Sequence, residues 1–156
     1  MDKVKYLEGP KFIADKDDRL IYNCTLAGSD FFLTYIFNDN DKLIGARYVL
    51  DKIFSNPDFY VNDFAKFKEM LIKKYGFPYR DEQNWLSSIL NKDPNNIGSA
   101  LENSSVSLVA AWHNAETDIK LSLMKSDKIY LIIDYTAIKY RELENEEILK
   151  KSLDNL

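Results

Sequence analysis

The stretch from Asn62 to Pro78, NDFAKFKEMLIKKYGFP, constrains the fold most, because its start, its end and its buried face can all be read from its residues. Asn62 is a suitable N-cap, since its side-chain oxygen can accept from free backbone N–H groups of a first helical turn. Four large apolar side chains follow on one helical face: Phe64, Phe67, Leu71 and Tyr75. Gly76 favours the left-handed conformation that ends helices, and Pro78 prevents continuation. The stretch predicts an amphipathic helix, with an alternative start at Pro57.

Short segments on both sides of this helix have the alternation and the β-branched and aromatic content typical of strands. The expected strands are residues 19–26, 30–37, 42–50, 106–113, 117–124 and 129–136. Residues 38–41, NDND, indicate a turn, because short polar side chains hydrogen-bond their own backbone and tolerate left-handed angles. We therefore predict an α+β fold whose antiparallel sheet consists of two three-stranded β-meanders, each followed by a helix. The second helix is expected near residues 144–153.

The remaining segments carry weaker signals. Residues 2–18 are polar and are interpreted as a short lead-in. A short helix is expected from Asp81, because Trp85 and Ile89 are four positions apart. Residues 92–105 contain Pro94 and Gly98 and form the longest irregular stretch, for which we predict a mobile loop.

The length of 156 residues indicates one domain, residues 1–156, and the order of elements suggests two related halves. When residues 19–78 are aligned with residues 106–156, Leu20 meets Leu108 and Leu33 meets Leu121. A tandem repeat is one explanation. Two unrelated meanders that share the same turn chemistry are the other.

Charge and composition exclude several classes of function. The 25 acidic and 21 basic residues are mixed along the chain and leave a net charge of −4, which argues against general binding of nucleic acid. The sequence as given has no apolar run long enough for a membrane span and no signal peptide. The expected location is therefore cytoplasmic by default, or the cell envelope if an export signal has been removed.

Catalytic and metal-binding residues are scarce. The chain has one histidine, His113, and one cysteine, Cys24, which excludes the usual zinc sites. Clustered aspartates lack the glycine and the distal glutamate of a calcium loop. We expect no metal and no cofactor. A nucleophile–base pair of Cys24 with His113 is conceivable, but a free cysteine in a strand is more often a small buried hydrophobe.

Aromatic residues in and near the strands are the most suggestive candidates for a binding surface. One helix cannot cover both faces of a six-stranded sheet, so some aromatic rings are expected to be exposed or covered by a partner. The alternative is that helices at both ends of the meanders cover them. The candidate binding residues are Phe32, Tyr35, Tyr48, Trp112, His113 and Tyr130.

Several residues together resemble a group of bacterial and phage proteins with no assigned activity. They are the helix end KKYGFP, Trp85, Asp93-Pro94, Gly98, Trp112, Thr117-x-Ile119-x-Leu121 and Ile133-x-Tyr135, within residues 30–140. In layout alone, the chain also resembles lipoprotein domains of the SmpA/OmlA type and β-lactamase-inhibitor proteins, which implies tandem helix-plus-sheet modules. Those relatives usually carry an export or lipid-anchor signal and an extra N-terminal helix, and neither is visible in this sequence.

These observations predict a non-catalytic protein-binding module that uses an aromatic sheet face or the loop at residues 92–105. The expected partner is another protein, and a homodimer through a sheet face is a further alternative. An immunity-type or phage-encoded inhibitor of a specific bacterial protein is the second hypothesis. A small cofactor-independent enzyme that uses His113 is the third.

Overall fold

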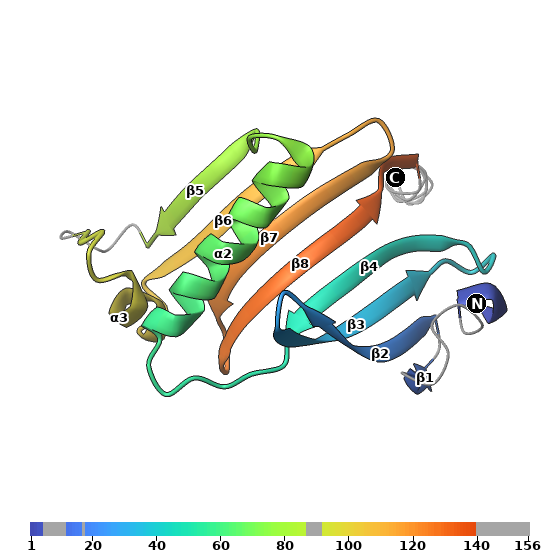
Figure 1. Cartoon of the computed structure of the whole chain (residues 1–156), viewed down its shortest axis with the longest axis horizontal. Coiled ribbons are helices and arrows are strands. Elements are labelled where there is room, and N and C mark those ends of the chain that lie inside the picture. Colours follow the sequence, from blue (N-terminus) through green and yellow to red (C-terminus); the bar gives the residue numbers. More distant parts are fainter. Residues whose placement is uncertain (5–11, 17, 87–91, 140–156) are drawn as a thin grey trace, which may run out of the picture.

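The computed structural model describes residues 1–4, 12–16, 18–86 and 92–139, and its main feature is one antiparallel sheet (Figure 1). Eight strands lie in the order β1-β2-β3-β4-β8-β7-β6-β5. The strands are β1 Phe12–Lys16, β2 Arg19–Leu26, β3 Ser29–Phe37, β4 Leu43–Leu50, β5 Arg80–Trp85, β6 Val106–His113, β7 Thr117–Lys125 and β8 Ile129–Ala137. The two longer helices are α2 (Asp58–Tyr75) and α3 (Ile97–Glu102), and residues 2–4 and 138–139 are also helical.

The predicted α+β class, the antiparallel sheet and the two meanders are confirmed, but each meander has four strands. The expectation of a lead-in was wrong for residues 12–16, which form β1 and pair with β2. The antiparallel pairing of β4 with β8 joins the two meanders. The helix expected at residues 144–153 lies outside the described residues, and the tandem repeat stays a prediction.

The helix expected from Asp81 is wrong, because Arg80–Trp85 forms the edge strand β5. Each residue from Arg80 to Trp85 is in register with β6, and Trp85 lies opposite Val106. The free backbone groups of β6 stabilise an extended neighbour more than one apolar pair at helical spacing stabilises a helix. The polar side chains of β5 suit an edge, where charges discourage pairing with other chains.

Helix α2 confirms the predicted buried face and corrects the predicted start. It begins at Asp58, directly after Pro57, so that Asn62 lies inside the helix rather than at its cap. The Asp58 N–H is bound instead by the side-chain oxygen of Asn56, at 2.9 Å. The helix ends as predicted at Gly76, which has a φ of 83° and donates to the Ile72 carbonyl at 2.8 Å.

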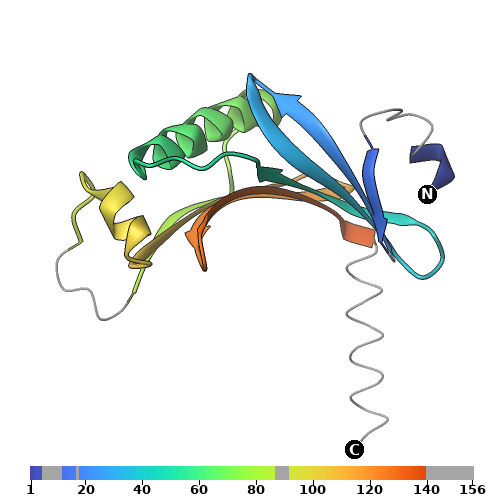
Figure 2. The same cartoon turned by 90° about the horizontal axis from the view of Figure 1, so that it is seen from below.

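The main core lies between α2, α3 and one face of the sheet (Figure 2). Alternate residues of β3, β4 and β6–β8 point toward the helices, as the two-residue period of a strand requires. A second cluster on the same face covers β2 and β3 and includes Leu20, Tyr22, Leu33 and Phe37, with Met1 and Val4 packed against it. The helices therefore cover one face, which we call the helix face.

The prediction that residues 92–105 are irregular is wrong in part, because α3 lies within them. Ile97 and Leu101 are buried on the inner side of this short helix. Gly98 permits the close approach to α2, since a Cβ at this position would meet the Asp58 carboxylate and lie 3.0 Å from the Asp58 backbone nitrogen. Packing, rather than local sequence preference, orders this segment.

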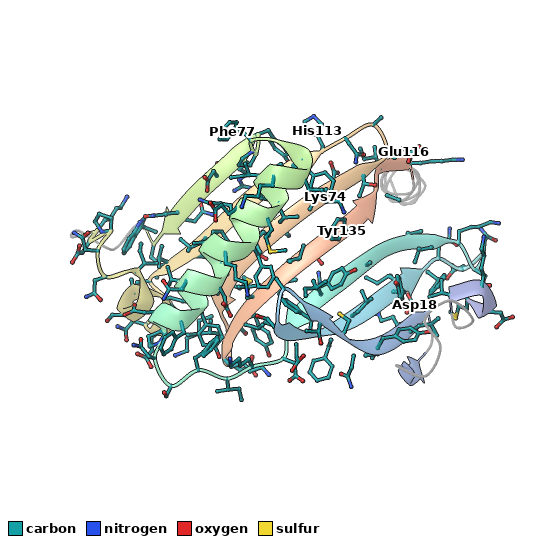
Figure 3. All side chains as sticks on the ribbon, viewed as in Figure 1. Asp18, Lys74, Phe77, His113, Glu116 and Tyr135 are labelled. Carbon is teal, nitrogen blue, oxygen red and sulfur yellow. The ribbon has the colours of Figure 1, made fainter. Side chains whose placement is uncertain are left out.

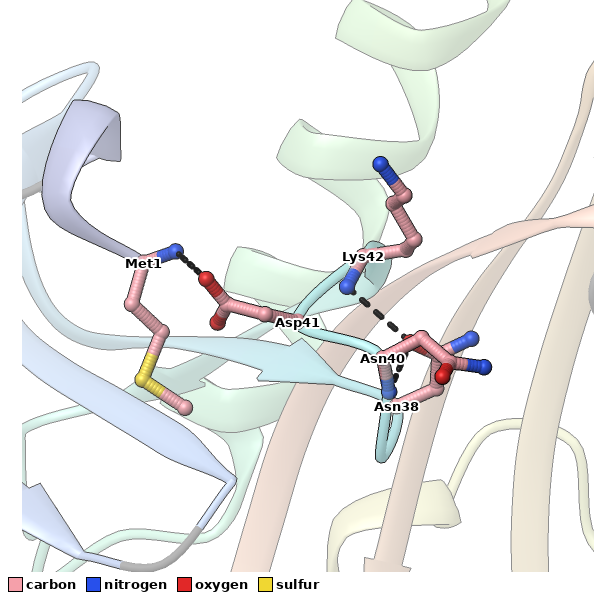
Figure 4. Close-up of polar contacts among 5 residues, drawn as sticks. All are labelled: Met1, Asn38, Asn40, Asp41 and Lys42. Carbon is pink, nitrogen blue, oxygen red and sulfur yellow. Dashed lines mark hydrogen bonds and ion pairs between the residues drawn. The ribbon is translucent and has the colours of Figure 1, made fainter.

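The turn between β3 and β4 confirms its predicted chemistry (Figure 4). The Asn38 side-chain oxygen accepts from the backbone N–H groups of Asn40 and Lys42, at 3.1 and 3.0 Å. Asp41 has a φ of 58°, in the left-handed region. The Asp41 carboxylate lies 2.9 Å from the Met1 amino group.

Candidate functional site

The sheet face opposite α2, which we call the open face, is covered by neither α2 nor α3, both of which lie on the other side of the sheet (Figure 2). Its side chains are those that alternate with the core positions of each strand. A search of the described helices finds none that is long and apolar enough to cross a membrane. The side chains of the open face are the first candidates for a site, because neither α2 nor α3 packs on them.

An apolar row crosses the middle of the open face. The register places Phe32 of β3 opposite Val49 of β4, and Val49 opposite Ile132 of β8. The row continues through Ser122 of β7 to Val109 of β6. Phe32 is 38 % exposed, and the other apolar members are half-buried. We call the four apolar residues of this row the apolar band, which the buried Ser122 interrupts between β8 and β6.

A row of charged residues lies next to the apolar band, two residues away from it along each strand. Arg47 of β4 lies opposite Asp134 of β8, and Asp134 lies opposite Lys120 of β7. The Arg47 guanidinium donates two hydrogen bonds to the Asp134 carboxylate, one from Nε at 2.6 Å and one from Nη2 at 3.3 Å. Lys120 is exposed, and its ammonium group has no ion pair within the described part of the chain.

The charged row ends at the sheet edge with a second ion pair. Arg80 of β5 lies opposite the small residue Ala111 of β6, which in turn lies opposite Lys120. The Arg80 guanidinium contacts Glu82 at 2.8 Å, and this hydrogen bond raises the pKa of Arg80. The charges in this row are therefore largely paired across the surface, and Lys120 stands out as the exception.

A groove of about 370 Å³ is hollowed into the open face along the charged row. Its lining includes Arg47, Lys120, Arg80 and Thr136. Gly45 also lines it and lies opposite Thr136, so that β4 contributes no side chain at this point. A Cβ at Gly45 would lie 2.9 Å from the Tyr135 carbonyl oxygen, which explains why a glycine is needed where β4 approaches β8.

The structure divides the six predicted binding residues between the two faces. Phe32, His113 and Tyr130 belong to the open face, where the Tyr130 hydroxyl donates to Asp127 at 2.9 Å and its pKa is raised by that bond. Tyr35 and Tyr48 are half-buried on the helix face. Trp112 is buried, and its indole N–H donates to the Gly76 carbonyl at 2.8 Å, so it fastens the end of α2. The structure does not bring these six residues together.

The pair of Cys24 and His113 is likewise not brought together. Cys24 lies on β2 and His113 on β6, five strand spacings apart in the sheet order, which corresponds to about 24 Å. They also point to opposite faces. Within the described residues, the His113 ring, labelled in Figure 3, packs instead against Tyr79, with centroids 4.9 Å apart. This arrangement offers no nucleophile–base geometry between the two residues.

Several residues of the open face were not recognised from the sequence. They are Val49, Val109, Ile132, Arg47, Lys120 and Asp134. The sequence does hold a signal for these positions, namely the two-residue alternation of each strand. Each of them is next in sequence to a buried or half-buried residue that points to the helix face. Recognising that they form one surface requires the cross-strand register, which tells which residues of neighbouring strands lie opposite one another. Among the described residues, no group of three or more His, Cys, Asp and Glu side chains is placed to hold a metal ion.

Tyrosines on the helix face form a packed ladder under α2. Tyr48 lies edge-on to Tyr135, with ring centroids 6.0 Å apart, and Tyr135 is hydrogen-bonded to Tyr75 of α2. Burial, followed by the bond to Tyr75, raises the pKa of Tyr135 well above its usual range. Tyr135 is labelled on β8 in Figure 3. These hydroxyl groups therefore serve packing rather than chemistry.

The raised pKa of Tyr135 predicts a loss of stability in alkali. A folded-state pKa above the unfolded value means that the stabilisation is complete below about pH 10 and is lost as the pH rises further. We expect the free energy of unfolding, measured in urea, to fall above pH 10 and to fall less steeply in Tyr135→Phe. A Tyr79→Phe variant serves as the control, because the Tyr79 ring is 64 % exposed, and it is expected to retain the wild-type slope.

Comparison with known proteins gave no similar protein: no family model, no curated sequence and no solved structure matches this chain.

Proposed function

We propose that this protein is a non-catalytic binding module that holds a partner protein against the open face of its sheet. The observation that carries the proposal is the apolar band on a sheet face that no described helix covers. A protein interface usually has an apolar centre and a polar rim, and the apolar band with the charged row on one side of it has the corresponding parts. The band runs from β3 to β6 and is bordered by the charged row.

The size of the open face supports a protein as the partner. Eight strands spaced about 4.8 Å apart make a face about 38 Å wide. A stable interface buries about 800 Å² on each partner, which such a face can provide. A small molecule would use only the groove.

The charges of the open face indicate the chemistry of the partner. Arg47 is neutralised by Asp134, and Arg80 by Glu82. Lys120 remains as a cation next to the apolar band, so the proposed partner presents apolar side chains to the band and a carboxylate to Lys120. Replacing paired charges would change the affinity little, because such rim pairs contribute about 0–1 kcal/mol.

The alternative surface at residues 92–105 is less suited to this role. The inner residues Ile97 and Leu101 are used in the core, and the exposed remainder, residues 92–96, 99 and 102–104, is polar apart from Pro94. Hot spots of interfaces are usually large apolar or aromatic side chains, which residues 92–96 lack.

A pair of variants tests the proposal on the partner obtained by cross-linking and mass spectrometry from the native cell. Ile132→Asp places a charge in the apolar band and is expected to weaken the affinity at least about 30-fold, the effect of one hot-spot residue. The control is Phe77→Ser, which removes an 88 % exposed ring from the connection between α2 and β5. Calorimetry measures both affinities, and circular dichroism checks folding. Equal affinity of wild type and Ile132→Asp, with both folded, would refute the proposal.

A further inference from the structure

A second hollow, of about 550 Å³, lies on the helix side of the sheet, away from the open face. Three segments form it: the turn between β2 and β3 at Gly28, the connection from β4 to α2 at residues 51–57, and the first three turns of α2. We call it the α2 hollow. Its volume lies within the range of about 300–1,000 Å³ that is common for ligand sites.

Exposed apolar side chains gather at the α2 hollow. Phe59, in the first turn of α2, is 50 % exposed and contributes to its wall. Phe54 contributes a half-buried ring, whose centroid lies 5.6 Å from that of Phe59. Ile53, between the lining residues Lys52 and Phe54, is 82 % exposed. Apolar groups that remain exposed together in this way mark interaction sites.

The walls of the α2 hollow are held in place by the core. Tyr60 is buried, and its hydroxyl group accepts from the Phe54 N–H at 3.1 Å and lies 3.2 Å from the Lys52 carbonyl, to which it donates. The Tyr60 ring packs edge-on against Phe54 at 4.8 Å. The connection between β4 and α2 is therefore preorganised, which lowers the entropic cost of binding.

Two lysines give the α2 hollow a positive rim. The Lys52 ammonium lies 4.8 Å from the centroid of the Phe54 ring. The Lys66 ammonium donates to the Ala27 carbonyl at 2.7 Å, and thereby joins α2 to the turn between β2 and β3. Neither lysine forms an ion pair with a carboxylate of the described chain, and Asp63 is the one acidic residue in the lining. The excess charge is positive.

We propose that the α2 hollow binds a peptide segment of a partner protein that carries a large apolar side chain next to a carboxylate. The apolar side chain packs between Phe54 and Phe59, and the carboxylate lies between Lys52 and Lys66. A hollow of this size receives one or two side chains, whereas a stable dimer of this chain requires about 800 Å² on each copy. The α2 hollow is separate from the open face, so a test of binding at the hollow does not depend on whether the proposed function is correct.

The test uses the full chain and two blocked dipeptides as probes. Acetyl-Trp-Glu-amide supplies both the apolar ring and the carboxylate, and acetyl-Trp-Gln-amide supplies the ring without the charge. Amide chemical shifts are followed by NMR during each titration. We expect saturable shifts at Gly28, Ser29 and Asn62, and an affinity for the charged probe about three- to fivefold higher, the contribution of an exposed ion pair.

Matched variants identify the contacts. Phe59→Ser is expected to weaken binding of both probes about tenfold or more, since it removes half of the apolar wall. Lys52→Gln is expected to reduce the preference for the charged probe to about twofold or less, because Lys66 remains, and it disturbs no side-chain hydrogen bond of the described structure. Phe77→Ser, which removes an 88 % exposed ring elsewhere, is the control and should bind as the wild type does.

Three outcomes would overturn the inference. The first is the absence of saturable shifts at the α2 hollow, and the second is equal binding by the wild type and a folded Phe59→Ser. The third is self-association in sedimentation velocity that Phe59→Ser abolishes, which would assign the hollow to a second copy of the chain. Loss of probe binding in Ile132→Asp is not expected, because Ile132 lies on the other face.

Discussion

Phe31→Ala is expected to lower the free energy of unfolding by about 3–5 kcal/mol, whereas Phe32→Ala, which removes a ring that is 38 % exposed, is expected to lower it by about 1–2 kcal/mol. The two residues are neighbours in β3 and point to opposite faces. Phe31 is 1 % exposed and packs edge-on against Phe67 of α2, with centroids 5.1 Å apart. Its removal leaves a cavity under the helix that rigid strands cannot fill.

Urea unfolding at neutral pH measures both values, and the two variants act as controls for each other. Because the side chains are identical and adjacent, differences in helix or strand propensity cancel. Phe32→Ala should fold normally and lose affinity for a partner at the open face. Similar destabilisation by the two substitutions would mean that the open face is covered as closely as the helix face, which would contradict the assignment of the faces.

This pair of residues shows what the sequence could and could not predict. The residues DFFLTYIF of β3 are apolar on both faces, so the sequence predicts a strand without telling which face is buried. The covered face follows from the register and from α2. Trp112, Tyr35 and Tyr48 looked like candidates for binding for the same reason, and the structure places them on the helix face.

Helix α2 was the best predicted element because its signals are local. Phe64, Phe67 and Leu71 recur at helical spacing and are buried, and Gly76 ends the helix as predicted. Of the two predicted starts, Asn62 is wrong and the alternative at Pro57 agrees with the structure to within one residue, since Pro57 is the N-cap and the helix begins at Asp58. Here Asn56 binds the Asp58 N–H.

Strand β5 shows the opposite case, in which the stabilising contacts are not local. Its residues, RDEQNW, have neither apolar alternation nor β-branched side chains. It is extended because β6 offers an edge, which is visible only after the chain has folded. The groove on the open face depends in the same way on Gly45, Arg47 and Lys120, which the register brings together from different strands.

Gly45→Val is expected to lower the free energy of unfolding by about 3 kcal/mol, and Gly45→Ala by about 1 kcal/mol. The position lies at the junction of β4 and β8, the pairing that joins the two meanders. Replacing glycine in a strand usually gains about 0.5–1 kcal/mol, because the unfolded chain becomes less flexible. Here a Cβ would lie 2.9 Å from the Tyr135 carbonyl oxygen, a backbone atom that moves only if the strands separate. The collision therefore outweighs the gain.

Hydrogen exchange distinguishes this mechanism from a general loss of stability. If Gly45→Val separates the two meanders, the amides of β4 and β8 should exchange faster than those between β6 and β7 by more than the global change explains. Arg47→Ala is the control, because it lies two positions away on the same face of β4 and loses only a partly exposed ion pair, worth about 1 kcal/mol or less. A Gly45→Val protein as stable as the wild type would show that the contact with Tyr135 relaxes freely, and that the two meanders are not rigidly joined at this glycine.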